Sequence, residues 1–204
     1  MSTGAVNSDL AVVILAAGAA RRYGGAKQLA QFEGASLVRR AALAALSVAD
    51  DVTVITGAYA EVVTADLQAL PLKILHNPDW ALGMGHSLAY GFNAPQTQRA
   101  AATLLMLADQ VLIGAPQLRF LIATHRQFPE RIVAADHGEH LGPPCLFPAA
   151  YYPELAALSG DRGARGLLQK HGAFVVPVAL PEAAVDIDTP EDYAKLLAAS
   201  QTNA

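Results

Sequence analysis

Short apolar segments alternate along this chain with segments of helical periodicity, and this alternation limits the folds that the chain can adopt. The run AVVILA at residues 11–16 leads into a glycine-rich loop, and AATLLMLA at residues 101–108 runs directly into Asp109. Continuous apolar runs of this length are typical of strands that are buried on both faces. Strands of that kind, alternating with helices, predict a doubly wound α/β fold with a mainly parallel sheet and helices on both faces.

The remaining segments fit the same architecture. We expect further strands at 51–56, 72–76, 131–136 and 173–180, the last at a sheet edge because it contains Pro177. Helices are expected at 36–48, 59–70, 86–92, 116–126, 149–157, 163–171 and 189–200. The glycine- and proline-rich residues 137–148 are expected to be irregular, with brief strand pairing at 145–147. No linker or repeat divides the chain, so we expect one domain over residues 1–204, with frayed ends at 1–9 and 200–204.

Composition excludes several classes of protein. Only 16% of the 204 residues are charged and the formal net charge is −4, so the chain lacks the basic character of a nucleic-acid-binding domain. No apolar run approaches the ~18 residues of a membrane span, and the opening MSTGAVNSDL does not resemble a signal peptide. The single cysteine, Cys145, is expected to be a buried core residue, and His137 and His140 lack the spacing of a zinc site. We therefore expect a cytoplasmic protein that binds neither nucleic acid nor membranes.

The loop after the first strand, LAAGAARRYGGAKQLAQFEG, combines little side-chain bulk with positive charge. Gly18, Gly24 and Gly25 allow the backbone to approach a ligand closely, and N–H groups in such a loop can bind a phosphate. Arg22 and Lys27 can contact the same anion, Arg22 through a bidentate fork and Lys27 as a point charge. The spacing matches neither the P-loop nor the G-x-G-x-x-G pattern, which argues against Walker-type NTPases and dinucleotide-binding dehydrogenases. A flexible loop with solvated charges is the alternative.

Three aspartates lie where the carboxyl ends of strands can hold a metal ion. Asp109 ends a hydrophobic strand, where a carboxylate is unfavourable to bury but well suited to hold Mg²⁺ together with substrate phosphates. Asp186 and Asp188 in DIDTPEDY flank one isoleucine, so in an extended segment both carboxylates point to one face. A second carboxylate from this segment would complete the metal site with Asp109. A local Asx turn at Asp109 and a local structural role for Asp188 are the alternatives.

Two further segments combine glycines with polar residues. NPDWALGMGHSL is a glycine-containing turn that enters a helix, and the N-terminus of that helix, near Ser87, can face a phosphate or a base. SGDRGARGLL groups Asp161, Arg162 and Arg165 around glycines. Taken alone, this second segment is more consistent with a solvated loop.

Together these segments resemble one enzyme family. The pattern LAAGxxxRxGxxK is similar to the signature loop of nucleotidyltransferases that transfer a nucleoside monophosphate from an NTP, and here it consists of Leu15, Ala16, Ala17, Gly18, Arg22, Gly24 and Lys27. HNPDWALGMGHSL, LMLADQ, GPPCLFP, SGDRGARGLL and DIDTPEDY follow in the family's order. They look most like the molybdenum cofactor cytidylyltransferase branch of the MobA-like NTP transferases. The resemblance covers nearly the whole chain and implies a Rossmann-like nucleotidyltransferase fold.

The resemblance also implies a role for each site residue. The implied nucleotide-binding residues are Leu15, Ala16, Ala17, Gly18, Gly24, Gly25, Lys27, Ser87 and Asp109. Arg22, Lys27 and Asp109 are the implied catalytic residues, and Asp109 and Asp188 look like the Mg²⁺ ligands. The LAAG spelling is similar to that of cytidine-using members, which implies transfer of CMP from CTP to the phosphate of molybdenum-bound molybdopterin, with release of pyrophosphate. A molybdenum hydroxylase apoenzyme is a further candidate partner.

The sequence departs from the family pattern at two places, and it leaves alternatives open. Val111 follows the aspartate-glutamine pair where relatives often have proline, which here is delayed to Pro116, and Tyr23 replaces a commoner methionine or phenylalanine. The acceptor can instead be another phosphorylated compound, such as a sugar or polyol phosphate, and the donor can be GTP. A non-catalytic chaperone that carries the cofactor to a molybdenum hydroxylase is a further alternative. Arg21 is expected to be spare, because the signature spacing selects Arg22.

Overall fold

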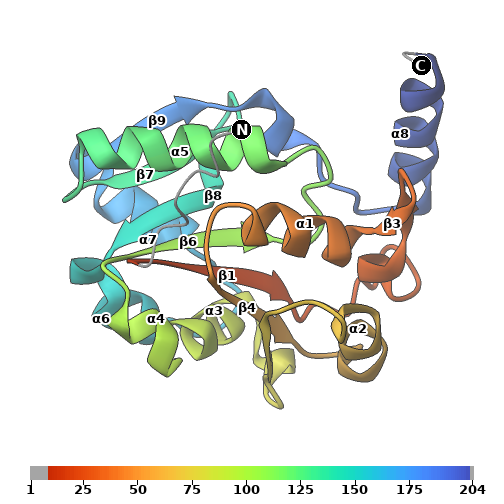
Figure 1. The fold of residues 1–204 in the computed structure, drawn as a ribbon, viewed down its shortest axis with the longest axis horizontal. Helices are drawn as coiled ribbons and strands as arrows, with labels where there is room; N and C mark the ends of the chain where they lie inside the picture. The colour runs from red at the N-terminus through yellow and green to blue at the C-terminus, as the bar shows by residue number, and fades with distance from the viewer. Residues whose placement is uncertain (1–8, 203–204) are drawn as a thin grey trace.

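A computed structural model describes residues 9–202 and is built around a seven-stranded sheet (Figure 1). The strand order is β5-β4-β1-β6-β8-β7-β9. The strands are β1 (Leu10–Ala16), β4 (Asp51–Thr56), β5 (Lys73–His76), β6 (Ala102–Leu107), β7 (Ile132–Asp136), β8 (Leu141–Pro148) and β9 (Val175–Ala179). Neighbouring strands pair in parallel except at β8, which is antiparallel to both β6 and β7. The expected mainly parallel α/β sheet is therefore confirmed, and Pro177 lies in the edge strand β9 as predicted.

Helices cover both faces of this sheet, as the sequence predicted. Alternate side chains of β1 enter two separate cores, with Val12 and Ile14 in one and Val13 and Leu15 in the other. The first core includes side chains of α1 (Leu37–Leu46), α2 (Ala60–Leu67) and α5 (Ala115–Gln127). The second core includes side chains of α3 (Met84–Phe92), α6 (Tyr152–Ala156) and α7 (Arg165–Lys170). Accordingly, α1 and α5 lie on the opposite side of the sheet from α3 and α6 (Figure 1).

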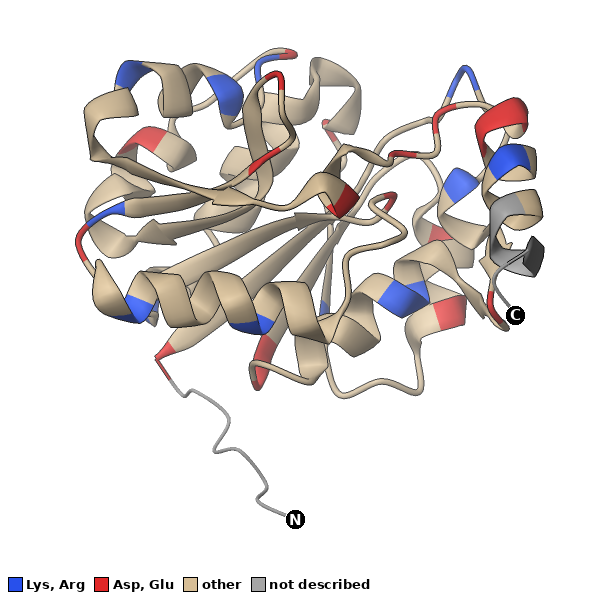
Figure 2. Ribbon diagram, turned by 90° about the horizontal axis from the view of Figure 1, so that it is seen from above, with Lys and Arg blue, Asp and Glu red and all other residues tan. Residues whose placement is uncertain are grey.

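Charged residues lie around the sheet and hardly at all within it. In the strands, the only Lys, Arg, Asp or Glu residues are Asp51, Lys73 and Asp136, each at the first or last position of its strand. The other Lys, Arg, Asp and Glu residues lie in helices and loops (Figure 2). This distribution explains why the strand sequences are continuous apolar runs, because neither face of a parallel sheet between two layers of helices is exposed to solvent.

The expectation of irregular structure at 137–148, with brief pairing at 145–147, is wrong for most of that segment. Residues from Leu141 onward form the antiparallel strand β8. Its prolines argued against a strand, because proline donates no ladder hydrogen bond. Pro143 and Pro144 are accommodated in a bulge, where β8 has two extra residues opposite the β7 neighbours Ala134 and Ala135.

Several helix boundaries differ from the expected ones by a few residues. The last helix, α8 (Pro190–Thr202), follows Thr189, whose hydroxyl accepts the N–H of Asp192 while the Asp192 carboxylate accepts the N–H of Thr189. It continues beyond the expected end at residue 200. Elements without a counterpart in the sequence prediction are α4 (Pro95–Arg99), β2 (Gln31–Phe32) and β3 (Ala35–Ser36).

Most of the expected frayed ends, at 1–8 and 203–204, lie outside the described residues. Within the described range, no helix has both the length and the apolar character that a bilayer crossing requires.

Strand direction gathers the polar loops at one edge of the sheet. β7 is antiparallel to β8 and β8 is antiparallel to β6, so β6 and β7 run in the same direction and end at the same edge. β1, β4 and β5 also end there, because they pair in parallel with one another and with β6. Ligands of open α/β sheets bind outside the carboxyl ends of the strands. The loop after β1, the loop after β6 and the turn between β7 and β8 are therefore the places where a site is expected.

Candidate active site

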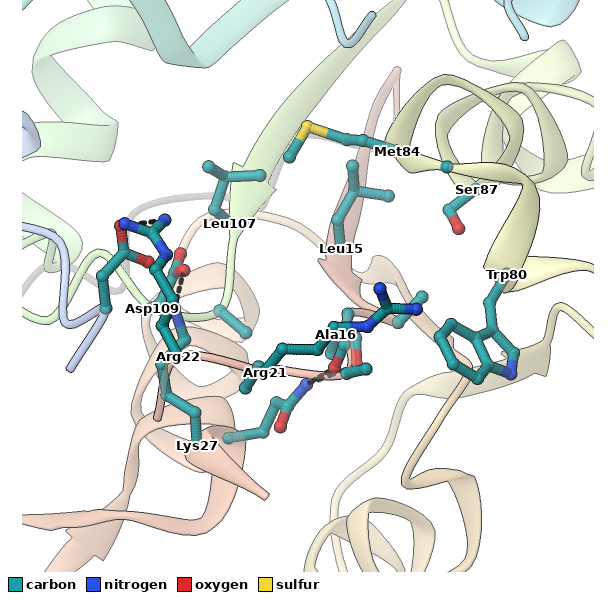
Figure 3. A pocket seen from close by; sticks show the side chains of 18 of the residues that line it. Leu15, Ala16, Arg21, Arg22, Lys27, Trp80, Met84, Ser87, Leu107 and Asp109 are labelled. Atoms are coloured by element: carbon teal, nitrogen blue, oxygen red, sulfur yellow. Dashed lines mark hydrogen bonds and ion pairs between the residues drawn. The ribbon is translucent and has the colours of Figure 1, made fainter. Parts of the chain in front are cut away.

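A cavity of about 540 Å³ opens at this edge, between the loop after β1 and the start of α3 (Figure 3). The residues predicted from the sequence that line it are Leu15, Ala16, Ala17, Gly18, Arg22, Lys27, Ser87, Asp109 and Asp188. Gly24 and Gly25 do not line it. Gly24 instead has a φ of +80° in the turn that precedes Lys27, a conformation that favours glycine. The fold thus brings residues from distant parts of the chain to one cavity.

The ammonium group of Lys27 lies between two carboxylates. Lys27 begins the 3-10 helix Lys27–Leu29, directly after the glycine turn, and its side chain is only 11% exposed. Its Nζ is 2.6 Å from Oδ2 of Asp109 and 3.1 Å from Oδ1 of Asp188. Arg22, whose side chain is 73% exposed, donates to Oδ2 of Asp188 at 2.8 Å. The two acids predicted as metal ligands therefore converge on a single buried cation.

Electrostatics in this cluster favour additional positive charge. Burial lowers the pKa of Lys27, but the charges and hydrogen bonds of Asp109 and Asp188 outweigh it, so the pKa is raised above its usual value. Asp186 is an exposed residue whose carboxyl group is nevertheless crowded by protein atoms. This partial desolvation, followed by repulsion from the two other carboxylates, raises the pKa of Asp186 to about 7. Asp186 thus adds a third negative charge near the two carboxylates that contact the Lys27 ammonium group.

The donor set fits a divalent cation that is shared with substrate phosphates. Among residues 9–202, no group of three or more His, Cys, Asp or Glu side chains is arranged to hold a metal ion. Asp109 and Asp188 contact the same nitrogen, so a cation at that position touches an oxygen of each. Mg²⁺ is usually held by one or two carboxylates together with substrate phosphates and waters, and not by a complete cage of protein ligands. The residues present therefore fit Mg²⁺ bound jointly by protein and nucleotide.

Gln28 is a cavity residue that the sequence interpretation missed. Its side chain is buried, and its Nε2 donates to the carbonyl oxygens of Ala16 at 3.1 Å and Gly18 at 2.8 Å. The amide thereby fixes the first residues of the loop after β1. Its Oε1 has no hydrogen-bond partner in the described part of the chain. The sequence signal was an amide directly after the signature lysine, but nothing in the pattern tells which carbonyl groups that amide meets.

The two neighbouring arginines differ in their contacts. Arg22, selected by the signature spacing, is paired with Asp188. Arg21, expected to be spare, also lines the cavity and extends toward Trp80 (Figure 3). It makes no ion pair or hydrogen bond with any described residue. Both arginines therefore line the cavity where an anion can bind. Arg22 must first give up its ion pair with Asp188 to contact that anion, whereas Arg21 need not give up any ion pair with a described residue.

On the opposite wall, a buried amide fixes the side chain of Ser87. Asn77 is fully buried, and its Nδ2 donates to Oγ of Ser87 at 3.0 Å and lies 3.3 Å from Nδ1 of His86. Its Oδ1 accepts the backbone N–H of Asp79 at 3.0 Å, which defines the orientation of the amide. Asn77 therefore ties the loop after β5, which carries Trp80, to the first turn of α3.

The GDRGAR segment supports the same wall. The backbone N–H of Gly85 in α3 donates to the carbonyl oxygen of Gly160 at 2.8 Å. A Cβ atom at Gly85 would lie 2.6 Å from the carbonyl oxygen of Arg162, so only glycine fits this contact. Asp161 lines the cavity itself. The segment is therefore packed against the site, which its sequence alone did not indicate.

Comparisons with known proteins agree with this geometry. The family model described as the MobA-like NTP transferase domain matches residues 12–174. The chain belongs to the MobA-like NTP transferase family. This transferase is 33% identical to nicotine blue oxidoreductase of Paenarthrobacter nicotinovorans over 197 residues, which cover 91% of this chain and 95% of that protein. It is 32% identical to the purine catabolism protein PucB of Bacillus subtilis over 192 residues, which cover 89% and 92% of the two chains.

Solved structures give the same result for the transferase. A Mycobacterium sp. strain JC1 homologue of Mycobacterium tuberculosis Rv0371c is 29% identical, with a TM-score of 0.80 and coverage of 98% of this chain and 100% of that chain. Rv0371c itself, in a crystal structure described as a complex with manganese, is 27% identical, with a TM-score of 0.73 and coverage of 93% and 98%. The resemblance inferred from the signature loop and its companion motifs is confirmed, and the chain is a nucleotidyltransferase by family and fold.

Proposed function

We propose that this transferase moves CMP from CTP to the phosphate of molybdenum-bound molybdopterin, with Mg²⁺ as the metal ion and pyrophosphate as the second product. The observation that carries the proposal is the buried Lys27 ammonium between Asp109 and Asp188, in a cavity lined by the glycine-rich loop. The LAAG motif at the start of that loop supports CTP as the donor. The 27% identical Rv0371c structure with manganese supports a divalent ion.

The residues of this chain bind and orient the triphosphate. Backbone N–H groups after β1 and the side chains of Arg21, Arg22 and Lys27 meet the negative charge of the phosphates. Arg22 and Lys27 turn from their carboxylate partners to the phosphates, which leaves Asp109 and Asp188 to hold the divalent ion. A bound Mg²⁺ supplies electrostatic stabilisation of the phosphoryl oxygens.

The reaction needs no nucleophile from the protein. A phosphate oxygen of the acceptor attacks the α-phosphorus of CTP in line, the bond from that phosphorus to the bridging oxygen breaks, and pyrophosphate leaves. The acceptor phosphate is ionised at neutral pH, so no general base is required. Lys27 and Arg22 stabilise the charge that develops on the α-phosphate and on the leaving group. Positioning and electrostatics therefore supply the rate enhancement.

A pyrophosphate-release assay on the full chain tests the proposal. CTP with Mg²⁺ and molybdopterin should give turnover, whereas GTP, ATP and sugar phosphates should not. Turnover with GTP and none with CTP would contradict the donor assignment, and turnover with a sugar phosphate and none with molybdopterin would contradict the acceptor assignment. Asp109→Asn should lower kcat/KM by roughly 100-fold or more, as expected when an interaction worth about 3 kcal/mol in the transition state is lost. The matched control Asp50→Asn changes an exposed aspartate outside the cavity and should leave the rate unchanged.

Two other activities predict different results. A cofactor chaperone would bind CTP equally well with and without Mg²⁺ and would release no pyrophosphate, which calorimetry and the same assay distinguish. The name of the 33% identical oxidoreductase supports a redox reaction as a second candidate, and this candidate predicts a redox reaction without release of pyrophosphate. The absence of a G-x-G-x-x-G fingerprint in the sequence argues against it.

A further inference from the structure

A third hydrophobic core lies apart from the two cores that flank the sheet. It consists of the buried side chains of Phe32, Leu37, Val111 and Ile187. These come from β2, the start of α1, the loop after β6 and the segment that precedes α8, and α8 itself stands beside β3 at one end of the molecule (Figure 1). The family match ends at residue 174, so Ile187 and α8 lie beyond it. This core joins the C-terminal segment to the loop after β6.

Both acids proposed to hold the divalent ion are adjacent to this core. Val111 lies two residues after Asp109, and Ile187 directly precedes Asp188. The residues just before Val111 and just before Ile187 also form an antiparallel bridge, so the two segments run side by side. Packing in this core therefore helps to set the separation between the carboxylates of Asp109 and Asp188.

The backbone of Asp188 is tied to the first turn of α8. The carboxylate of Asp192 accepts the backbone N–H of Asp188 at 3.3 Å and that of Thr189 at 2.9 Å. Among the described residues, the Asp188 carboxylate makes hydrogen bonds and ion pairs only with Arg22 and Lys27. Both of these cations turn to the phosphates in the proposed reaction, so the position of α8 then decides where the Asp188 carboxylate lies.

Tyr193 docks α8 on the loop after β1. Its ring lies edge-on to the ring of Tyr23, with 6.4 Å between the centroids, and its hydroxyl donates to the carbonyl oxygen of Gln31. Tyr23 directly follows Arg22, which pairs with Asp188 at 2.8 Å. The hydroxyl contact is exposed, so water can replace it at little cost, whereas both rings pack against the third core. The ring of Tyr193 is therefore the main contact between this helix and the loop.

We propose that Tyr193 is a positioning residue for the divalent ion. By docking α8 on Tyr23, it holds the Asp188 carboxylate at the separation from Asp109 at which one cation touches both. Tyr193 does not line the cavity, so it acts through Asp188 and not by contact with the nucleotide. This role rests on the proposed function, because the ion is the one that assists nucleotidyl transfer. Residues that orient metal ligands from outside typically change metal affinity by about 10- to 100-fold when they are replaced.

Calorimetry of CTP binding to the full chain, in Mg²⁺ and in EDTA, tests this role. Free CTP chelates Mg²⁺ equally in every sample, so a variant that changes the ratio of the two Kd values changes the protein's share in holding the ion. Tyr193→Ala should raise the Kd in Mg²⁺ roughly tenfold. It should not weaken binding in EDTA, because Arg22 and Lys27 remain. A residue that only stabilises the fold would weaken binding in both conditions alike.

Three further variants complete the comparison. Tyr193→Phe keeps the ring against Tyr23 and should bind CTP in Mg²⁺ like the unchanged protein. Tyr151→Ala is the matched control, because it removes a half-buried ring that packs edge-on to the His171 ring at 5.1 Å, outside the cavity, and it should leave the ratio of Kd values unchanged. Leu196→Ala removes another side chain that packs against the third core and should raise the Kd in Mg²⁺ by a smaller factor. This variant decides the matter if circular dichroism shows that Tyr193→Ala does not fold.

Mn²⁺ binding to the nucleotide-free variants, followed by electron paramagnetic resonance, separates this role from the proposed function. If the unchanged protein binds CTP more tightly in Mg²⁺ than in EDTA, an unchanged ratio in Tyr193→Ala overturns the positioning role alone. So does an equal loss in Tyr193→Phe or in Tyr151→Ala. If the unchanged protein binds CTP no more tightly in Mg²⁺, the proposed function is overturned. In that case a Mn²⁺ Kd that rises in Tyr193→Ala and not in Tyr193→Phe leaves the positioning role standing, and equal Mn²⁺ Kd values overturn it as well.

Discussion

Replacing Lys27 by methionine removes the cation on which the acidic cluster converges. The substitution keeps the length and apolar character of the side chain and deletes only the ammonium group. Asp109 and Asp188 then lose a contact of 2.6 Å and one of 3.1 Å, and both face the crowded carboxyl group of Asp186 without it. In the protein without nucleotide and metal, we expect a less stable fold.

The expected loss of stability depends on how exposed the paired side chains are to solvent. Removing one partner of a buried ion pair costs about 3–5 kcal/mol. The Lys27 side chain is 11% exposed, but that of Asp188 is 40% exposed and is screened by water, so we take the lower end. A loss of about 3 kcal/mol lowers the Tm of a chain of this size by roughly 6–12 °C. In the transferase assay, loss of an electrostatic contact to the transition state lowers kcat/KM by roughly 30-fold to 1,000-fold.

Thermal unfolding in EDTA, followed by circular dichroism, measures this loss of stability as a change in Tm. Lys73→Met is the matched control, because Lys73 makes a contact of similar length, 2.9 Å to Asp51, with side chains that are 54% and 48% exposed. Such a surface pair contributes about 0–1 kcal/mol. Added Mn²⁺ should raise the Tm of Lys27→Met more than that of the unchanged protein, because the metal ion no longer competes with an ammonium group. A Tm loss no larger than that of the control, or no greater gain from Mn²⁺, would refute this reasoning.

Three further outcomes follow from the structure. Gly85→Ala should lower the Tm and raise the KM for CTP, because its Cβ would meet the 159–162 backbone, whereas Gly166→Ala meets nothing within 4 Å and should be neutral in both measurements. Asp186→Asn in EDTA should stabilise the protein by about 1 kcal/mol above pH 7, since water screens this exposed group. The pKa of Asp186 is raised to about 7, so that gain should shrink as pH falls and vanish near pH 4; a pH-independent difference in urea unfolding would contradict this. Burial raises the pKa of the Cys145 thiol, so Ellman's reagent should react with it in denaturant and not in the native protein; prompt native reaction would show the burial to be wrong.

Features that depend on local chemistry were predictable from the sequence. The run before Gly18 and the run before Asp109 are apolar without interruption, so their burial as strands and the position of the loops after them follow directly. The family signature then selects Lys27, and the structure brings its side chain to Asp109 and Asp188. The strands and the position of the loops need only strand periodicity and the rule that ligands bind at the carboxyl ends of parallel strands, whereas Lys27 also needs the family signature.

Features that depend on long-range pairing were not predictable. Pro143 and Pro144 disfavour a strand locally, but the bulge opposite β7 accommodates them. The extended-segment argument puts Asp186 and Asp188 on one face, whereas in the structure Asp188 lines the cavity at the loop after β1 and Asp186 lines a separate cavity together with Gln110. The orientation of the Gln110 side chain depends on the carbonyl groups of Pro143 and Ala183, which are far away in the sequence, and no pattern around Gln110 predicts them.

The antiparallel insertion of β8 has a consequence for how this scaffold can diversify. The turn between β7 and β8 is closed by its own hydrogen bond, from the N–H of His137 to the carbonyl oxygen of His140 at 3.0 Å. The residues of this turn line a cavity that the glycine-rich loop after β1 does not border. A hairpin turn tolerates replacement and insertion without disturbing the sheet behind it. Exchanging this turn between family members is therefore expected to leave the glycine-rich loop after β1 and its cavity undisturbed.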